Sequence, residues 1–256
     1  MTNRDQIPFW VITGAASGIG AAVTQQVAES GARVLALDVD NEKGRTLSES
    51  TGAAFLSFDV SDYEQWQQLQ SKIKTEFGEW GAPTRLHLNA GIQIAPPTAP
   101  LSDYQLEAMT LDRYQKMMGV NVDGVVFGLK AMLPLMGAGS AIVVTASLAG
   151  VTPYTVDPLY AMSKHAMVGL VRSMGPILKA RGIAIHALCP GGVDTSLVPL
   201  AQKGNPAAFM TPQTLADDVV ALMTEEESGK SWVRLRTDKP KYIIRAPGDK
   251  LSLIHI

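Results

Sequence analysis

Short apolar runs alternate with amphipathic stretches along this chain of 256 residues. The runs have the length and composition of buried strands, and we expect strands at 9–12, 33–38, 54–58, 86–88, 141–145 and 183–188. Apolar residues with helical spacing predict helices over 21–30, 62–77, 111–136, 160–179 and 214–223. Strands that alternate with helices favour right-handed crossovers and a parallel sheet covered on both faces. The proline-rich stretch 95–100 is expected to be a surface loop.

Composition narrows the class of protein. A chain with 46% hydrophobic and 18% charged residues, and with no repeat or linker, is expected to form one domain over residues 1–256. The net charge of -2 and the lack of a long basic run argue against nucleic acid as a partner. Cys189 is the only cysteine, which excludes an intramolecular disulfide and a zinc site built on thiolates. With no apolar leader in residues 1–6 and no apolar stretch of membrane length, we expect a cytoplasmic protein without a membrane partner.

A glycine-rich turn follows the first expected strand, where a helix begins. Gly14, Gly18 and Gly20 would let the chain turn tightly and let a ligand approach the backbone. Backbone amides and a helix N-terminus at such a place can hold a pyrophosphate, although a glycine turn alone is weak evidence. Asp38 ends the next strand, where its carboxylate can accept hydrogen bonds from the adenosine ribose. That charge would repel a 2'-phosphate, and no cation is present at positions 15–17 or 39, so NAD is favoured over NADP.

Tyr160 and Lys164 are four residues apart on an expected helix, so both side chains share a face. An ammonium beside a phenol favours the phenolate, and we expect Lys164 to lower the pKa of Tyr160 toward neutrality. Tyr160 would then serve as a general acid or base. The same spacing is also common on ordinary helix surfaces, and the remaining motifs decide between the two interpretations.

Several motifs in order make the chain similar to the short-chain dehydrogenase/reductase family, in its single-domain branch, over nearly its whole length. They are Gly14-x-x-x-Gly18-x-Gly20, Asp59-Val60, Asn89-Ala90-Gly91, Asn121, Ser147, Tyr160-x-x-x-Lys164 and the run from Pro190 to Thr195. The resemblance implies an α/β fold, a single-domain Rossmann fold with a doubly wound parallel sheet. It also implies an NAD(H)-dependent oxidoreductase and, by analogy, a homotetramer or homodimer.

The resemblance assigns four catalytic residues. Tyr160 would exchange a proton with the substrate oxygen, and Ser147 would hydrogen-bond the same oxygen. Lys164 would hold the nicotinamide ribose and lower the pKa of Tyr160. Asn121 is similar to the family asparagine that holds a water between Lys164 and solvent.

The resemblance also assigns cofactor contacts, in addition to Asp38, Tyr160 and Lys164. They are Gly14, Ser17, Gly18, Ile19 and Gly20 in the turn, Asp59 and Val60 at the adenine, Asn89, Ala90 and Gly91 along the cleft, and Pro190, Gly191, Val193 and Thr195 at the nicotinamide. Bland alternatives stay open: Asp59 as a helix cap, 89–91 as an ordinary turn and 190–192 as a strand end. Leu88 departs from the family pattern, which usually has a second asparagine there.

The substrate pocket is expected to be mostly apolar. Its candidates are Gln93, Leu148, Ala149, Tyr154 and Leu197, the last on a substrate loop at about 194–212. The stretch 91–121 is longer than usual, and its extra residues could shape the pocket mouth or decorate the surface. The tail 234–256 could pack on another subunit or complete its own core. His165 is expected on the helix surface, and the scattered histidines suggest no metal site.

Together these features predict an NAD-dependent oxidoreductase that interconverts a hydrophobic secondary alcohol and its ketone. Two alternatives remain. A sugar-nucleotide epimerase or dehydratase usually has a different glycine spacing and a larger substrate domain. A non-catalytic NAD-binding sensor or scaffold would keep the glycine turn, but it would have no need of Ser147, Tyr160 and Lys164 together.

Overall fold

The chain forms an eight-stranded sheet in the order β3-β2-β1-β4-β5-β6-β7-β8, in a computed structural model that describes residues 7–204 and 208–246. The strands are β1 (Phe9–Thr13), β2 (Arg33–Asp38), β3 (Ala54–Ser57), β4 (Arg85–Leu88), β5 (Ala141–Thr145), β6 (Ala184–Pro190), β7 (Lys230–Arg234) and β8 (Tyr242–Ile244). Neighbouring strands from β3 to β7 are parallel, and β8 is antiparallel to β7. This order is that of a doubly wound Rossmann fold, as expected.

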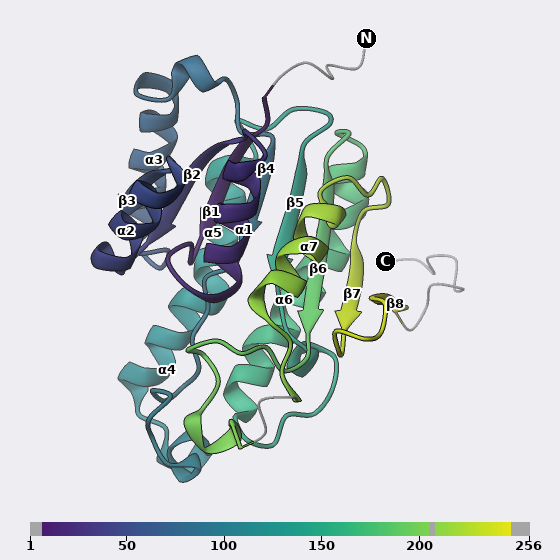
Figure 1. Cartoon of the computed structure of the whole chain (residues 1–256). Helices are drawn as coiled ribbons and strands as arrows, with labels where there is room; N and C mark the ends of the chain where they lie inside the picture. Colours follow the sequence, from purple (N-terminus) through teal and green to yellow (C-terminus); the bar gives the residue numbers. More distant parts are fainter. Residues whose placement is uncertain (1–6, 205–207, 247–256) are drawn as a thin grey trace.

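Helices cover both faces of the sheet (Figure 1). They are α1 (Gly18–Glu29), α2 (Asn41–Thr51), α3 (Tyr63–Thr75), α4 (Leu111–Met118), α5 (Gly124–Met132), α6 (Pro158–Lys179) and α7 (Pro212–Leu222). One core lies between the sheet and α3, α5 and α6, and the other lies between the sheet and α1 and α7. Strands β1 and β5 are buried at every residue, which explains their uninterrupted apolar sequence.

Helix α2 was not predicted, because its apolar residues form no stripe; Gly44 is its only buried residue. Its ends carry the signal instead. The Asp40 carboxylate accepts the Lys43 N–H at 3.1 Å, and Gly52 ends the helix in the left-handed conformation with φ of 74°. Local capping therefore determines this element more than burial does.

The expected helix over 111–136 is divided. A π-helical turn, Gly119–Asp123, joins α4 to α5, which ends at Met132. Asn121 lies in this turn, and π-turns inside helices are frequent at functional sites. Strands β7 and β8 were not predicted either. They place part of the 234–256 tail on the sheet of the same chain, and residues 247–256 lie outside the described residues.

The longer segment after β4 packs against the rest of the domain. It contains two short 3-10 turns, Leu101–Tyr104 and Leu106–Ala108, and its Tyr104 side chain is fully buried. Ile94 and Ala95 join Tyr104 in a third apolar cluster, so the expected surface loop at 95–100 begins inside the protein. Within the described residues, no helix combines the length and the apolar character needed to cross a bilayer.

Helix α6 approaches the loop before β7 more closely than side chains would permit. A Cβ on Gly175 would overlap the Gly229 backbone, and Gly229 itself has φ of 79°. The Gly229 N–H donates to the Ile185 carbonyl oxygen at 2.7 Å, which fixes this loop to β6. The position of α6 on the sheet thus depends on a backbone-to-backbone contact.

We expect Gly175→Ala to lower the free energy of unfolding by about 2 kcal/mol, because overpacking against fixed backbone outweighs the better helix propensity of alanine. Gly169→Ala is the matched control on the same helix, since no atom lies within 4 Å of its Cβ position. The control should stabilise the protein by up to about 1 kcal/mol. Urea unfolding of both variants measures the difference, and equal stabilities would contradict the predicted contact.

Candidate active site

The loop after β1 turns tightly against the loop after β4. Gly14 and Gly18 have φ of 62° and 53°, in the left-handed region that favours glycine. A Cβ on Gly14 would lie 2.8 Å from the Ala90 Cα, and one on Gly20 would overlap the Gly14 carbonyl oxygen. The turn can close only because these positions carry no side chain.

Thr13 and Asn89 hold the turn in place. The Thr13 hydroxyl oxygen accepts the N–H groups of Asn89 at 2.9 Å and Ala90 at 3.2 Å. In return, the Asn89 amide donates to the carbonyl oxygens of Thr13 and Gly14, both at 3.2 Å. The carboxyl ends of β1 and β4 are therefore locked together. Leu88, where a second asparagine was expected, is buried in the core on the α5 side.

The N-terminus of α1 is open to a ligand. Its N-cap residue Ser17 is exposed and makes no side-chain bond to the first turn, and Ile19 is partly buried beside it. A Cβ on Gly18 would lie 3.1 Å from the Thr195 methyl group, so the loop after β6 faces the turn. Uncapped first-turn N–H groups at the positive end of a helix dipole fit a pyrophosphate.

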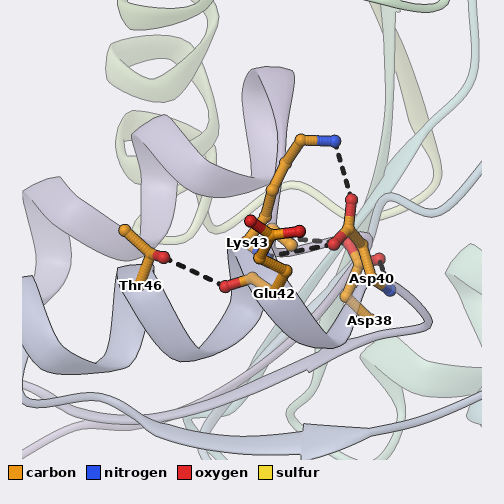
Figure 2. Close-up of polar contacts among 6 residues, drawn as sticks. Asp38, Asp40, Glu42, Lys43 and Thr46 are labelled. Carbon is orange, nitrogen blue, oxygen red and sulfur yellow. Dashed lines mark hydrogen bonds and ion pairs between the residues drawn. The ribbon is translucent and has the colours of Figure 1, made fainter.

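Asp38 lies at the carboxyl end of β2, between the glycine turn and α2 (Figure 2). Its carboxylate accepts the Ala16 N–H and the Asp40 N–H, both at 2.9 Å. Each oxygen keeps a further lone pair for a ribose hydroxyl. Sequence reasoning missed a cation in this region: the Lys43 ammonium lies 2.7 Å from the Asp40 carboxylate, and this pair is mostly exposed.

The side chains of Asp59 and Val60, both expected at the adenine, contact different parts of the protein. The Asp59 carboxylate accepts the N–H and the hydroxyl of Ser61 at 2.9 and 2.6 Å, while the N-cap of α3 is Asp62. Asp59 therefore does not cap this helix. The Val60 side chain packs into the core against Gly124, which leaves only its backbone for an adenine contact.

Residues 190–195 lead from β6 into the expected substrate loop. Pro190 ends β6, and the Gly191 N–H donates to the Arg234 carbonyl oxygen at 2.8 Å. The loop returns beside its start, where Val193 pairs with Met210 and the Asp194 N–H donates to the Met210 carbonyl oxygen at 2.9 Å. The described part of the loop is thus closed at its base.

Ser147, Tyr160 and Lys164 come together beyond the carboxyl end of β5. Tyr160 is 6% exposed and Lys164 3%, and the Lys164 ammonium lies 5.5 Å from the centre of the Tyr160 ring. This ammonium donates to the Thr145 carbonyl oxygen at 2.9 Å and packs against the Gly91 Cα, where a Cβ would be 3.1 Å away. The Ser147 side chain is partly buried and interacts with the Tyr160 hydroxyl. The structure therefore brings the three predicted catalytic side chains together.

The direction of the Tyr160 shift differs from the expected lowering. Burial raises the pKa of the Tyr160 phenol, and the Ser147 hydroxyl offsets this only in part. Burial also lowers the pKa of Lys164 to about 8, so the cation itself is disfavoured. Desolvation is therefore the largest influence on the pKa of both groups.

Asn121 links the loop after β4 to α6. Its side-chain oxygen accepts the Ile92 N–H at 2.8 Å, and its amide donates to the Ile92 carbonyl oxygen at 2.8 Å and to the Ser163 hydroxyl at 3.0 Å. The Cβ position of Gly91 lies 3.1 Å from the Lys164 ammonium and 3.4 Å from the Asn121 side-chain oxygen. Asn121 and Lys164 thus border the same small region.

Asp157 is a residue that sequence reasoning missed. It is the N-cap of α6 and is completely buried. Its carboxylate accepts the Tyr160 N–H at 2.8 Å and the Ile94 N–H at 3.0 Å. An aspartate three residues before Tyr160 was the available signal, because it is a typical N-cap residue.

Three of the five expected pocket residues pack in the same apolar cluster as Tyr160. Ala149, Tyr154 and Leu197 belong to the apolar cluster of Tyr160, and the Tyr154 and Tyr160 rings are 6.1 Å apart. Leu148 begins a short 3-10 turn that packs on α6 and belongs to the neighbouring core. Gln93 lies between this cluster and the substrate loop, since its amide donates to the Leu197 carbonyl oxygen at 3.3 Å.

The substrate loop is fastened to its surroundings. The Tyr154 hydroxyl donates to the Gln202 side-chain oxygen at 3.0 Å, and the Leu200 N–H donates to the Pro97 carbonyl oxygen at 2.9 Å. The Lys203 ammonium, also on this loop, lies 2.7 Å from the Asp194 carboxylate. The long segment after β4 therefore contacts the expected substrate loop.

Four other reactive side chains were not assigned to the site, and one of them, Cys189, lies close enough to Ser147 and Lys164 to interact with both. His165 is exposed on α6, as expected, and Cys189 is buried, which raises its thiol pKa to about 12. His87 and His186 are buried, and desolvation lowers their pKa values to about 3 and about 4. Across residues 7–204 and 208–246, no three His, Cys, Asp or Glu side chains are grouped to hold a metal ion.

Comparisons with known proteins agree with this geometry. The family model described as short chain dehydrogenase matches residues 9–205. A (+)-cis,trans-nepetalactol synthase of Nepeta racemosa is 32% identical over 202 residues, covering 77% of this chain and 74% of the relative. A 2,5-dichloro-2,5-cyclohexadiene-1,4-diol dehydrogenase of Sphingobium indicum is 31% identical over 239 residues, covering 91% of each chain.

A solved structure extends the likeness to the fold. The short-chain dehydrogenase from Burkholderia cenocepacia J2315, in complex with NADP, has a TM-score of 0.78 and 25% sequence identity. The match covers 93% of this chain and 100% of the other. The glycine turn at the β1–β4 junction, the partly buried Ser147 and the buried Tyr160 and Lys164 lie within the matched range of the family model. The chain therefore belongs to the short-chain dehydrogenase/reductase family.

Proposed function

We propose that this protein is an NAD-dependent oxidoreductase that interconverts a hydrophobic secondary alcohol and its ketone. One observation carries the proposal. Tyr160 and Lys164 are buried together beside Ser147, at the carboxyl ends of the strands, where the glycine turn also lies. Burial of a lysine and a tyrosine without a paired carboxylate is costly, and such arrangements occur at functional sites.

In this proposal, Tyr160 exchanges a proton with the substrate oxygen. Burial keeps the phenol protonated, so it is ready to donate to a carbonyl oxygen during reduction. The Ser147 hydroxyl would stabilise charge on the same oxygen and orient it. A bound nicotinamide would supply or accept the hydride. Lys164 would hold the nicotinamide ribose, and Asn121, at the same small region, would hold a water between Lys164 and solvent.

The substrate is proposed to be a small carbocyclic alcohol or ketone. The walls nearest Tyr160 are apolar or aromatic: Ala149, Tyr154, Ile94 and Leu197. Such walls favour an uncharged ring over a strongly anionic substrate. The relative named as a cyclohexadiene-diol dehydrogenase supports a ring-bearing secondary alcohol. A homo-oligomer stays part of the proposal by family analogy.

NAD is preferred in this proposal because Asp38 faces the end of the glycine turn through its bond to the Ala16 N–H. A 2'-phosphate placed near this carboxylate would be repelled. Lys43 could offset the repulsion, but Asp40 already engages its ammonium at 2.7 Å. The related structure with bound NADP shows that the family fold also accepts the phosphorylated cofactor, so the choice rests on these side chains.

Turnover of a panel of cyclic, aryl and steroid secondary alcohols with NAD, followed by nicotinamide absorbance, tests the proposed function. Tyr160→Phe should reduce kcat by at least about 100-fold while the Kd for NADH stays within about twofold, because only the proton-transfer hydroxyl is lost. Tyr63→Phe, which removes a hydroxyl on α3, is the matched control and should keep full activity.

Activity retained in Tyr160→Phe would remove this residue from the mechanism. NADH binding without turnover of any alcohol or ketone would favour the sensor alternative. Product formation without a change in nicotinamide absorbance would show a non-redox reaction and contradict the proposal.

We expect NADPH to bind at least about tenfold more weakly than NADH, a difference of about 1.4 kcal/mol. Asp38→Ala should narrow that ratio, because it removes the charge next to the 2' position. Asp112→Ala, which removes an exposed carboxylate in the first turn of α4, should leave the ratio unchanged. Fluorescence titration of both cofactors measures the ratio, and equal affinities in the unaltered protein would contradict the role of Asp38.

The two directions of the reaction should depend differently on pH. Alcohol oxidation needs the phenolate as base, and burial raises the Tyr160 pKa, so kcat/KM for oxidation should increase from about pH 6 to about pH 9. Ketone reduction needs the protonated phenol, which stays the main form, so its kcat/KM should stay nearly flat. Initial rates in both directions provide the test, and oxidation that slows as the pH rises would refute the assignment.

A further inference from the structure

The Asp157 carboxylate is buried at the start of α6, next to the helix turn that carries Tyr160. Its side chain has no exposed surface. The groups that stabilise its charge are the backbone N–H groups of Ile94, Tyr160 and Leu159, while burial raises its pKa. A carboxylate kept in such a place without a cation needs several fixed donors around it.

The two oxygens of this carboxylate bind two different parts of the protein. Oδ1 accepts the Tyr160 N–H at 2.8 Å, within the first turn of α6. Oδ2 accepts the Ile94 N–H at 3.0 Å, 63 residues earlier in the sequence. One side chain therefore joins the segment after β4 to the backbone of the proton-transfer residue.

In the part of the chain that the structure describes, the carboxylates of the N-cap residues Asp40 and Asp62 bond only within their own helices. Asp62, at the start of α3, is exposed, and its carboxylate bonds only to Glu64 and Gln65 of its own helix. Helix capping alone thus requires neither the burial of Asp157 nor its bond to Ile94. The additional bond calls for a separate explanation.

The segment that Asp157 fastens belongs to the apolar cluster of Tyr160, which the proposed function assigns to the substrate pocket. Ile94, Ala95 and Tyr104 are buried in the same apolar cluster as Tyr160. A second tether supports the same segment, since the Gln105 amide donates to the carbonyl oxygens of Thr155 and Val156 at 3.2 and 2.9 Å. The wall is therefore held against the chain that leads into α6.

We propose that Asp157 is a positioning residue that holds the pocket wall at Ile94 in register with Tyr160. The inference rests on the proposed dehydrogenase function. Hydrogen bonds donated to a charged group in a low-dielectric interior are strong and directional. The pocket wall at Ile94 and the first turn of α6 should therefore move together. A substrate that packs on the wall is then presented to the Tyr160 hydroxyl in a fixed orientation.

Asp157→Ser separates the two bonds. A serine hydroxyl still caps the Tyr160 N–H, but its single oxygen cannot also serve the Ile94 N–H. We expect KM for the ring alcohol to rise at least about tenfold, kcat to change by less than about threefold, and the Kd for NADH to stay the same. Asp62→Ser, the same substitution at an N-cap remote from the site, should change none of these values.

Hydrogen exchange provides a readout that needs no turnover. In Asp157→Ser, amide exchange should accelerate in peptides covering 92–104 and stay slow in peptides covering 158–164. If the protein has no alcohol dehydrogenase activity at all, the proposed function fails, while the exchange experiment still tests whether Asp157 fastens the wall.

Asp157→Asn is the second variant, because it keeps the size of the side chain and loses one acceptor. It should show the same change in KM if the serine variant does not fold. An unchanged KM in a folded variant, or unchanged exchange in 92–104, would overturn the proposal. A fall in kcat with no change in KM would also overturn it, because that result would assign Asp157 to the helix turn alone.

Discussion

The backbone contact between the loops after β1 and β4 is the constraint on which the rest of the site depends. Gly14 approaches Ala90 so closely that a single added methyl group would separate the loops. The Asn89 and Thr13 side chains each hydrogen-bond the backbone of the other residue, and these bonds hold the turn closed from both sides. Because β1 and β4 are neighbours, the glycine turn lies where the strand order reverses, which is the place where open α/β sheets bind ligands.

Desolvation is the second theme of the site. A buried phenol resists ionisation and a buried amine resists protonation, so burial favours the neutral forms of both Tyr160 and Lys164. The Thr145 carbonyl oxygen and the Tyr160 ring face are the contacts that the structure gives to the ammonium. Each carries only a partial negative charge, so a charge that binds beside Lys164 should have a large effect on the pKa of its ammonium.

Much of the architecture could be predicted from periodicity, because parallel strands buried on both faces give uninterrupted apolar runs such as that of β5. Helix α2 was missed because caps rather than an apolar stripe define it. The site residues Ser147, Tyr160 and Lys164 are brought together as expected, since two of them share a helix face and the third follows β5. The spacing of the motifs could not predict that the Val60 side chain packs into the core.

The direction of the Tyr160 shift could not be obtained from sequence, because it depends on how deeply α6 and the segment after β4 bury the ring. Asp157 has the same limitation. Its capping role follows from its position before Tyr160, but its bond to Ile94 joins residues far apart in the chain. Contacts of this kind become visible only when the tertiary structure is known.

Strand β8 has a consequence for the solution behaviour of the sheet. It covers the free edge of β7 but is itself only three residues long. Lys239, Lys241 and Arg245 lie on either side of it. A short outer strand flanked by cations offers few unpaired backbone groups to a second sheet and repels an identical edge. Within the described residues, β8 therefore makes this edge of the sheet a poor template for pairing with another sheet.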